Sequence, residues 1–598
     1  MTDYRAPIDD MRFALHEIAG LEELSRLEGF AAADPELIDQ VLEEAGRLAS
    51  EVVAPLNHVG DRVGAVFENG VVRTPEGFQE AYHTYVSAGW NSLPFDPDYG
   101  GQGLPWVVAG AVQEMWNSAN MAFALCPLLN QGAVELLSAH GSPDQKETYL
   151  PKMISGAWTG TMNLTEPQAG SDVGAVKTRA TPSGDHYLIQ GQKIYITYGE
   201  HDFTDNIVHM VLARTPGAPE GTRGISLFLV PKYMVNADGS LGQKNDLRCV
   251  SIEHKLGINA SPTCVMAYGD SGGAVGYLVG EENQGMRQMF TMMNNARLAV
   301  GIQGIGVAER AYQQARAFAF DRVQSRDLAD HAGAPVAIIK HPDVRRMLLT
   351  MKALTEAARG LTYHTLAGLD RANAVTDERS RQQQMIDVVE LLTPVVKAWS
   401  TDIGVEVASL GVQVHGGMGF VEETGAAQHY RDARIAPIYE GTNGIQALDL
   451  VNRKVVRHRG FPARSFSATV RQEVEALAKL PGERFAGLRR ELTAGAEALD
   501  GATDWLCEVW ANNPRLAAAG ATPYLRLLGT LGGGWVLARQ AVAAARQLEA
   551  ANGQAAYLQG KITTARFYAD NILPQASAAA AAVTRGAETT LELEDAQF

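Results

Sequence analysis

The spacing of apolar positions divides the chain into regions of different character. Between about residues 10 and 155, apolar side chains recur every three or four positions, which is typical of amphipathic helices. The clearest runs are residues 37–48, 108–116 and 133–139. Stretches rich in Pro and Gly at 94–105 and 141–143 interrupt this pattern, so we expect loops there. The first quarter of the chain is therefore predicted to be helical.

Short runs rich in β-branched and apolar residues replace the helical pattern between about residues 157 and 280. These runs are residues 187–190, 193–198, 206–213, 225–230 and 263–268. Gly191 and Gln192 separate the first two runs, and this spacing predicts a β-hairpin. Because no helical pattern lies between the runs, we expect a closed or sandwich-like β domain.

Helical spacing returns after about residue 283 and continues to about residue 452. Residues 299–319, 344–369 and 385–410 are each long enough to cross a helical bundle. A basic stretch with one proline at 453–464 is interpreted as a linker, and an Ala-rich helical section follows it. The sequence thus predicts an α+β fold whose parts are an N-terminal extension at 1–34 and domains at 35–156, 157–282, 283–452 and 465–598.

The charge balance narrows the classes of partner. The chain carries 68 acidic and 51 basic residues, a formal net charge of −17 at pH 7. A surface this negative repels nucleic acid and anionic lipid, so neither is expected as a main partner. An anionic small molecule would need a locally basic pocket or a helix N-terminus.

The four cysteines and the N-terminus indicate the compartment. Cys126, Cys249, Cys264 and Cys507 lie far apart, so neither a disulfide framework nor a metal site is expected, and a reducing environment fits. The N-terminus has no apolar segment of a secretory signal. No run of eighteen apolar residues occurs, so no transmembrane segment is predicted. We therefore expect a cytoplasmic protein.

Two short motifs in the predicted β domain carry candidate chemistry. Residues 162–172, Met-Asn-Leu-Thr-Glu-Pro-Gln-Ala-Gly-Ser-Asp, form a polar turn whose small residues let backbone N–H groups approach a ligand. Residues 193–197, Lys-Ile-Tyr-Ile-Thr, form an alternating strand with Tyr195 and Thr197 on one face, suited to stacking on a flat heterocycle. Taken alone, each motif is more simply a connecting loop and one face of a barrel.

A third block of motifs lies in the second helical region. A glycine-rich segment at 411–420 could present N–H groups to a pyrophosphate or simply end a helix. The string Ile-Tyr-Glu-Gly-Thr-Asn-Gly-Ile-Gln at 438–446 places Glu440 at a loop-to-helix turn, where an acid alone would complement the helix dipole. By contrast, the Gly-x-x-Gly-x-Gly string at 301–306 lies in a helical run and opens no βαβ unit, so it indicates close helix packing.

Together, these blocks resemble the acyl-CoA dehydrogenase family over roughly residues 35–450, in their order, spacing and sequence. The resemblance implies an N-terminal helical domain, a middle β-barrel domain and a C-terminal four-helix bundle, with FAD as cofactor. It implies α,β-dehydrogenation of an acyl-CoA to a trans-2-enoyl-CoA. In the family, the glutamate that matches Glu440 removes the α proton, and its backbone N–H holds the thioester oxygen. Flavin N5 takes the β hydrogen as hydride.

The same resemblance implies the other site residues. Positions matching FAD contacts are Met162, Leu164, Thr165, Ser171, Tyr195, Thr197, Arg322, Gln413, Gly416, Gly417 and Thr442. Positions matching substrate contacts are Ser171, Asn294, Arg297, Tyr439 and Gly441. Arg322 and the segment 413–417 match groups that reach the FAD of a neighbouring subunit, which implies at least a dimer. The ends of the chain are similar to the larger bacterial members with an extra C-terminal helical domain, among them the 3-methylmercaptopropionyl-CoA dehydrogenases. For these we expect a homodimer that passes electrons to an electron-transfer flavoprotein.

Several positions depart from the family pattern. Tyr195 stands where Trp is usual, Val323–Ser325 replace the usual continuation after Arg322, and His341 replaces a frequent Gln. Some relatives carry the base directly before the residue that matches Arg297, but Ala296 cannot accept a proton, so Glu440 has no rival.

Competing functions share parts of this pattern. They are an acyl-CoA oxidase that uses oxygen, a dehydrogenase specific for 3-methylmercaptopropionyl-CoA and a non-catalytic flavoprotein scaffold. The presence of Glu440 speaks against the scaffold, and a nitroalkane-oxidising relative would carry Asp there. The C-terminus lacks a Ser-Lys-Leu address, which is weak evidence against the oxidase. No motif specifies the acyl group.

Overall fold

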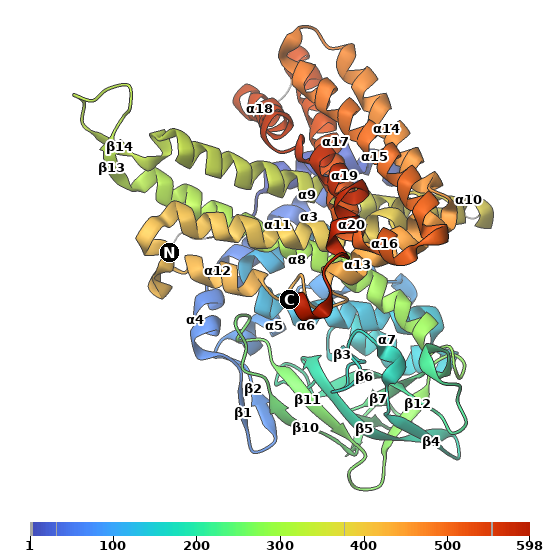
Figure 1. Ribbon diagram of the computed structural model, residues 1–598. Helices are drawn as coiled ribbons and strands as arrows, with labels where there is room; N and C mark the ends of the chain where they lie inside the picture. The colour runs from blue at the N-terminus through green and yellow to red at the C-terminus, as the bar shows by residue number, and fades with distance from the viewer. Residues whose placement is uncertain (1–3, 31–32, 376, 552–553) are drawn as a thin grey trace. The chain divides into compact units, whose positions relative to one another are not determined.

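The structure is a computed structural model that describes residues 4–30, 33–375, 377–551 and 554–598 (Figure 1). These residues form two compact units, each assembled from separate stretches of the chain. The helical unit comprises Met1–Gly46, Pro105–Ser118 and Val300–Phe598. The β unit comprises Arg47–Leu104 and Ala119–Ala299.

An eight-stranded, curled sheet forms the core of the β unit (Figure 1). Its strands are β3 (Trp158–Asn163), β4 (Arg179–Ser183), β5 (His186–Thr197), β6 (Asn206–Ala213), β7 (Ser226–Pro231), β10 (Leu247–Ile252), β11 (Thr263–Tyr268) and β12 (Ala274–Leu278). They pair in the order β10-β11-β5-β12-β7-β6-β3, with β4 added beside β5. The side chains of Ile189, Ile196, Phe228 and Met266 fill one hydrophobic core under the sheet. The β domain predicted from the sequence is confirmed, and β6 and β11 have the predicted bounds.

The predicted hairpin at Gly191 is wrong, because β5 runs through it without a turn. Residues of β5 before Gly191 pair with β12, and residues from Gly191 onward pair with β11. A Cβ at Gly191 would lie 2.5 Å from Thr178 Oγ1. The glycine is therefore required by a close approach to Thr178 while the strand passes from one partner to the other.

A small hairpin that the helical pattern missed lies in the β unit. Its strands are β1 (Val66–Glu68) and β2 (Val71–Arg73). Asn69 and Gly70, at φ 52° and 80°, join them through a two-residue turn with both residues left-handed. Two three-residue strands are too short to show an alternating pattern, but the Asn-Gly pair is a hairpin signal. The unit also holds α4 (Leu56–Val63), α5 (Phe78–Ser87), α7 (Pro143–Ile154), β8 (Tyr233–Val235) and β9 (Leu241–Lys244).

The helical unit is built around long helices that pack closely through glycines. Its members before residue 450 are α1 (Ile8–Ala14), α2 (Leu21–Leu24), most of α3 (Pro35–Leu48), parts of α6 (Trp106–His140) and α8 (Gly285–Asp321), α9 (Pro342–Ala374), α10 (Glu378–Gln384), α11 (Leu391–His415), α12 (Ala426–Ala433) and α13 (Asn443–Asp449). A Cβ at Gly304 would lie 2.3 Å from Ser400 O, and one at Gly404 would lie 2.9 Å from Gly304 O. The glycine string at 301–306 therefore packs α8 against α11, as predicted.

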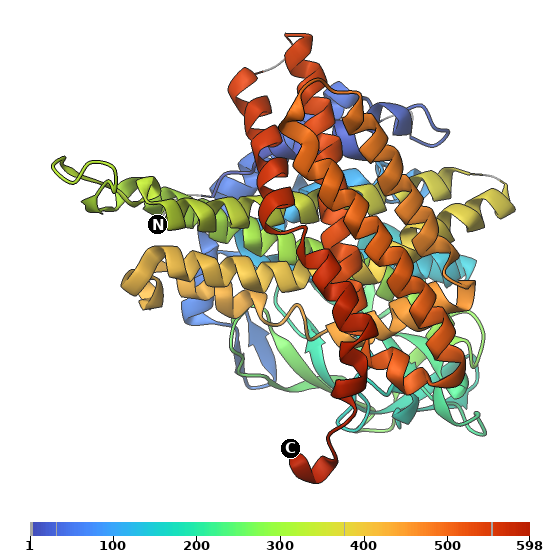
Figure 2. The ribbon, with the colours of Figure 1, turned by 45° about the horizontal axis from the view of Figure 1, so that its top comes forward.

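The C-terminal helices pack on the same bundle (Figures 1 and 2). They are α14 (Phe461–Ala478), α15 (Ala486–Asn512), α16 (Pro514–Ala519), α17 (Ala521–Glu549), α18 (Ala555–Asn571), α19 (Gln575–Thr584) and α20 (Gly586–Thr590). The central helix α17 contacts α9 and α11. A Cβ at Gly529 or Gly533 would lie 2.4 or 2.5 Å from the indole of Trp399, so α17 can approach α11 this closely only with glycine at both positions.

The expected linker at 453–464 is wrong in its extent. A π-helix at Leu450–Val455 and a 3-10 helix at Val456–His458 continue the chain beyond α13. Only Arg459 and Gly460 separate these turns from α14, and both are left-handed, at φ 52° and 76°. Pro462 lies in the first turn of α14, where its missing N–H costs nothing. The basic composition therefore belongs to helical turns.

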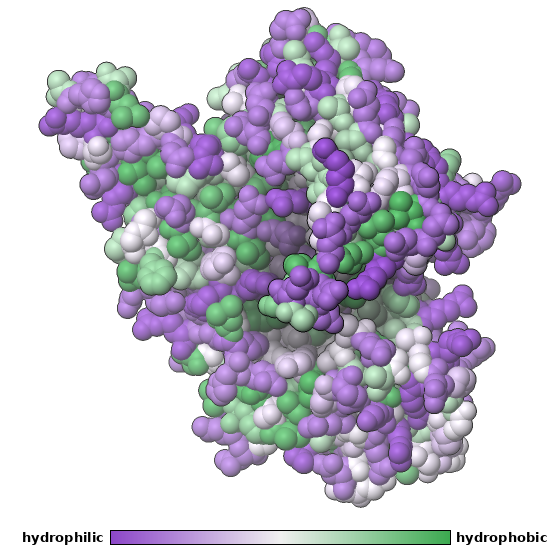
Figure 3. Space-filling view, viewed as in Figure 1, coloured by the Kyte–Doolittle hydropathy of each residue, from purple (hydrophilic) through white to green (hydrophobic). Residues whose placement is uncertain are grey.

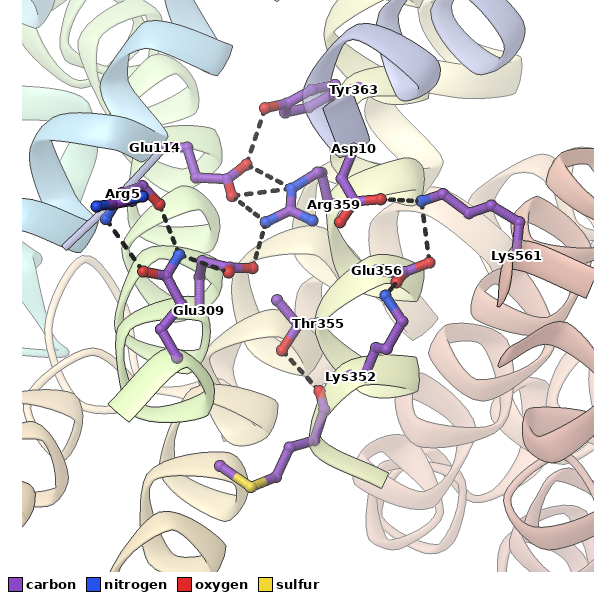
Figure 4. A network of polar contacts seen from close by, with 12 residues as sticks. Arg5, Asp10, Glu114, Glu309, Lys352, Thr355, Glu356, Arg359, Tyr363 and Lys561 are labelled. Atoms are coloured by element: carbon purple, nitrogen blue, oxygen red, sulfur yellow. Dashed lines mark hydrogen bonds and ion pairs between the residues drawn. The ribbon is translucent and has the colours of Figure 1, made fainter. Parts of the chain in front are cut away.

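A buried network of ion pairs connects five segments of the helical unit (Figure 4). The Arg359 guanidinium on α9 contacts Glu114 on α6 at 2.6 Å and Glu309 on α8 at 2.8 Å. Lys561 on α18 contacts Asp10 on α1 at 2.5 Å and Glu356 on α9 at 3.1 Å. The network therefore connects the two ends of the chain through α9. Each buried cation in it lies against two carboxylates, so the buried charges are paired.

One described helix, α6, is long and apolar enough to pass a length and composition test for a membrane span. Within its most apolar window, 89% of the residues are buried inside the protein, and Asn120 interrupts the helix with φ −162° and ψ 95°. A buried, kinked core helix accounts for these values. Over the C-terminal helices in Figure 3, hydrophilic side chains cover most of the visible face.

Candidate functional site

Glu440 lies in a tight turn directly before a helix. Its φ is 55° and that of Gly441 is 84°, so two successive residues are left-handed. Thr442 caps α13, because its side-chain oxygen accepts a hydrogen bond from Ile445 N at 3.3 Å. The predicted loop-to-helix turn is confirmed, and the helix begins after the glutamate. A non-glycine residue in this conformation is uncommon and marks a constrained segment.

Side chains from two long helices hold this turn. Tyr439 donates its hydroxyl hydrogen bond to Gln303 on α8. Lys397 on α11, which is fully buried, donates to Gly441 O at 2.8 Å. Gln446 donates to Glu440 O at 3.1 Å. Burial raises the pKa of Tyr439 well above its usual range, and the nearby Glu440 adds to this shift, so the phenol stays a hydrogen-bond donor.

Arg322 and the glycine segment at 413–417 are brought together by aromatic contacts in the helical unit. The Arg322 guanidinium lies 5.1 Å from the ring centroid of Phe318, whose ring lies 4.5 Å from that of His415. Gly416, at φ 59°, is the C-cap of α11. The helix-ending interpretation of the glycine segment is thus confirmed, and Gln413 lies in the last turn of the same helix.

In the β unit, the structure brings together the first two motifs. Thr165 O accepts a hydrogen bond from Ile194 N at 2.9 Å, and Leu164 O accepts one from Lys193 Nζ at 3.0 Å. The Lys193 ammonium also contacts the Glu166 carboxylate at 2.8 Å, with both side chains buried. Burial lowers the pKa of Lys193 to about 8 although Glu166 opposes this shift. Lys193 and hydrogen bonds overcome the burial of Glu166 and lower its pKa to about 2, so the pair is charged at pH 7.

Tyr195 has the most unusual position in the β unit. The residue is 60% exposed and its φ is 60°, at a bulge where the β5–β11 register shifts. Ile196 is buried in the sheet core, so Tyr195 and Thr197 lie outside that core. Met162 is on β3, and Ser171 is exposed in the loop beyond it, next to Gly170, whose surroundings are open. An exposed aromatic ring beside a strand and an open glycine loop fit a planar ring with a polar tail such as FAD.

The α8 residues Asn294 and Arg297 lie together in the β unit. Arg297 Nη1 is 3.5 Å from Asn294 Oδ1, and its guanidinium lies 5.8 Å from the Phe290 ring centroid. Ala296 presents a methyl group only. Glu135 on α6 is half-buried, and burial raises its pKa to about 8, with Asn295 as a hydrogen-bonding neighbour that opposes the shift. The sequence-predicted residues thus fall into groups in separate units, one around Glu440 and one around Tyr195 and Arg297.

Sequence reasoning missed the two lysines that support these segments. Lys193 stands within the strand motif itself, and Lys397 stands within the apolar run Leu391–Trp399 of α11. A lone lysine in an apolar run is the available signal, because a buried ammonium requires partners. The pattern does not say which groups those partners are.

Comparison with known proteins places this architecture in one family. Residues 37–157, 161–270 and 283–455 match the N-terminal, middle and C-terminal domains of acyl-CoA dehydrogenases, and residues 466–594 match a domain described as acetyl-CoA dehydrogenase C-terminal like. The chain therefore belongs to the acyl-CoA dehydrogenase family and is an oxidoreductase of that class. FAD is the cofactor of this family, so the cofactor expected from the sequence is confirmed at the level of the family.

Relatives cover nearly the whole chain. A 3-methylmercaptopropionyl-CoA dehydrogenase from Ruegeria pomeroyi is 49% identical over 98% of this chain and 99% of its own length. A butyryl-CoA dehydrogenase from Syntrophomonas wolfei is 36% identical over 96% of this chain and 95% of its own. An acyl-CoA dehydrogenase from Bacillus anthracis, solved with FAD, shares the fold with a TM-score of 0.74 at 20% identity, over 94% of this chain and 89% of its own. The extra C-terminal helices are therefore shared with relatives of similar length.

Proposed function

We propose that this acyl-CoA dehydrogenase acts through Glu440, which removes the α proton of a short acyl-CoA thioester. An α C–H of a thioester is a very weak acid in water, so removing its proton needs a carboxylate held in place and a donor for the developing enolate oxygen. Glu440 supplies both, with its carboxylate and its backbone N–H. Its left-handed backbone in a turn held on both sides supports this assignment.

The β-unit motifs are proposed to hold the cofactor. Leu164, Thr165 and Ser171 would contact the flavin through backbone and hydroxyl groups. Tyr195 would stack on the flavin ring, and Thr197 would form a hydrogen bond to it. When bound, FAD accepts the β hydrogen as hydride and so completes the α,β double bond. We infer that the electrons then pass to an electron-transfer flavoprotein rather than to oxygen.

Substrate contacts are proposed for four residues. Arg297 and Asn294 would bind the CoA moiety, and Tyr439 and Gly441 would flank the thioester. Ala296, at the alternative position for a base, has no proton acceptor, which leaves the role to Glu440.

The proposed acyl group is 3-methylmercaptopropionyl or a straight chain of similar length. The supporting observation is the 49% identity to a 3-methylmercaptopropionyl-CoA dehydrogenase, against 36% to a butyryl-CoA dehydrogenase. A thioether sulfur and a methylene are similar in size and polarity, so one pocket accepts both. A panel of acyl-CoAs from propionyl to palmitoyl plus 3-methylmercaptopropionyl, mixed anaerobically with the enzyme, should bleach the flavin fastest for acyl chains of three to five atoms.

A Glu440→Gln variant tests the base. It should retain FAD and lose acyl-CoA-dependent bleaching by at least about 10³-fold, since the amide cannot accept the proton. Bleaching of Glu440→Gln at the rate of the unaltered enzyme would falsify the assignment. Rapid reoxidation of the substrate-reduced enzyme in air would favour an acyl-CoA oxidase instead.

We also propose a homodimer whose subunits cover each other's exposed apolar side chains. Phe320, Val323 and Leu328 are 57%, 53% and 67% exposed on and beside the β-hairpin arm formed by β13 (Val323–Arg326) and β14 (Pro335–Ala337). Phe420 is 89% exposed next to the glycine segment. Phe420→Asp should shift the mass found by light scattering toward the monomer and lower the FAD content, because Arg322 and Gln413–Gly417 would no longer reach a partner's cofactor. A dimeric, fully loaded variant would argue against this interface.

A further inference from the structure

The turn that carries Glu440 is held in an unfavourable backbone conformation. A left-handed backbone is unfavourable for a non-glycine residue, and Glu440 at φ 55° is followed by Gly441 at φ 84°. Such a turn relaxes unless its peptide groups are held from outside. The carboxylate and the N–H of Glu440 point in useful directions only while the turn keeps this shape.

Lys397 provides a holding contact from a charged donor. It lies on α11, its side chain is fully buried, and its ammonium donates to Gly441 O at 2.8 Å and to Asn443 Oδ1 at 2.9 Å. Hydrogen bonds from a charged donor are about twice as strong as neutral ones. One ammonium group therefore fixes two acceptors that follow the glutamate, one of them the carbonyl of the very next residue.

Asn443 is itself locked from the other side. The two N–H groups of its Nδ2 face three acceptors, Ala398 O at 3.0 Å, Thr401 Oγ1 at 3.0 Å and Asp402 Oδ1 at 2.7 Å. These contacts turn the amide so that its oxygen faces Lys397. The resulting Lys397–Asn443–Asp402 chain spans one and a half turns of α11 and attaches the start of α13 to it.

The helix that carries Lys397 is itself rigidly placed. Gly304 and Gly404 bring α8 and α11 into backbone contact, and α8 supplies Gln303, the acceptor for Tyr439. Two helices in contact thus hold the residue before Glu440 and the residue after it. A displacement of about 1 Å in a catalytic group can cost about 100-fold in rate, so this support bears directly on catalysis.

We infer that Lys397 is a positioning residue for the proton-abstraction step, acting through Gly441 and Asn443 on the backbone of Glu440. This inference rests on the proposed function, because it presumes that Glu440 is the base. Lys397 transfers no proton. It keeps the Glu440 carboxylate and N–H directed at the same thioester.

The test compares Lys397→Met with the unaltered holoenzyme in anaerobic single turnover with butyryl-CoA. Methionine keeps the length of the side chain and removes the donors. We expect flavin reduction at saturating substrate to slow by about 10–100-fold, while FAD content stays at one per subunit and the half-saturating butyryl-CoA concentration changes less than about 3-fold. The kinetic isotope effect with α-deuterated butyryl-CoA should rise, because proton removal alone is impaired. A merely structural role would not produce this split.

Two further variants keep the result decisive. Asn443→Ala retains the ammonium and removes its second acceptor, so it should show the same pattern with a loss of about 10-fold. Lys561→Met removes another buried lysine, whose ammonium pairs with Asp10 and Glu356, so this variant should unfold at lower temperature yet reduce its flavin at the normal rate.

The outcomes separate the two proposals. Suppose that Glu440→Gln is inactive. If Lys397→Met and Asn443→Ala then reduce flavin normally, or if these two variants lose FAD in proportion to their activity, the positioning role is wrong and the base assignment stands. If Glu440→Gln reduces flavin normally, the proposed function fails, and this inference fails with it.

Discussion

A buried lysine supports each of two motif-bearing segments: Lys193 supports the loop motif at 162–172, and Lys397 supports the turn of Glu440. Both donate to a backbone carbonyl of the motif, Leu164 O and Gly441 O. The exposed positions of these motifs carry the proposed chemistry, and the buried ones fix their shape. At the residue scale, such a motif therefore contains both residues proposed to contact a ligand and buried residues that hold the backbone in shape.

The pair of Lys193 and Glu166 gives a prediction about stability. Lys193→Met leaves a buried carboxylate without its counter-charge, so the free energy of unfolding should fall by about 3–5 kcal/mol. The double variant Lys193→Met/Glu166→Gln removes both charges and should recover most of that loss. Denaturant unfolding followed by tryptophan fluorescence measures both. Equal losses in the single and double variants would mean that the charge pair is not the cause.

Glu135 gives a prediction about pH. Its folded-state pKa of about 8 lies above the ordinary value of 4.5, so between these values the folded state keeps a proton that the unfolded state has lost. The free energy of unfolding should therefore fall as pH rises through this window, by at most about 1.4 kcal/mol per unit, and less because the side chain is half-buried.

Glu135→Gln removes this dependence. The melting temperature of the variant minus that of the unaltered protein should therefore increase steadily from pH 5 to pH 8. Differential scanning fluorimetry across that range provides the measurement. A difference between the two proteins that stays constant with pH would place the pKa of Glu135 outside the window.

At the element scale, the contact between α8 and α11 depends on glycine. A Cβ at Gly304 would lie 2.3 Å from Ser400 O, so Gly304→Ala must push the two helices apart and should cost about 3 kcal/mol. Gly501→Ala, on the exposed side of α15 with open space around the glycine, is the matched control and should gain about 0.5–1 kcal/mol. Melting temperatures that move in the same direction would contradict this assignment.

The elements also show which structural features can be predicted from sequence patterns. Long helices and the strands β6 and β11 were predictable because their periodicity extends over many residues. The course of β5 at Gly191 was not, since a glycine that opens a turn and one that admits a close neighbour look the same in sequence. For the site, the local turn at Glu440 was predictable, but its left-handed backbone and its contact with Lys397 depend on a helix more than forty positions away in the chain.

At the scale of the whole molecule, the C-terminal helices are expected to be required for folding. Trp399 and Leu361 are buried, and both lie against α17, the first on Gly529 and the second on Gly532. A chain ending at residue 464 would expose this apolar surface, and we expect it to aggregate on expression. Removing only the exposed residues 592–598 is the control and should leave yield and activity unchanged. A soluble, FAD-loaded protein ending at residue 464 would overturn this expectation.

The ion network of the helical unit also sets an order of events during synthesis. Asp10 accepts a hydrogen bond from Tyr557, 547 positions later, and shares the charge of Lys561. The ribosome releases these partners last, so Asp10 on α1 can form its ion pair only after nearly the entire chain has been made. The β unit, whose last residue is Ala299, is complete when only half of the chain has been made. Vectorial folding should therefore yield a protease-resistant β unit first, and cells with slow translation near the 3′ end of the message should accumulate chains whose helical unit is still open.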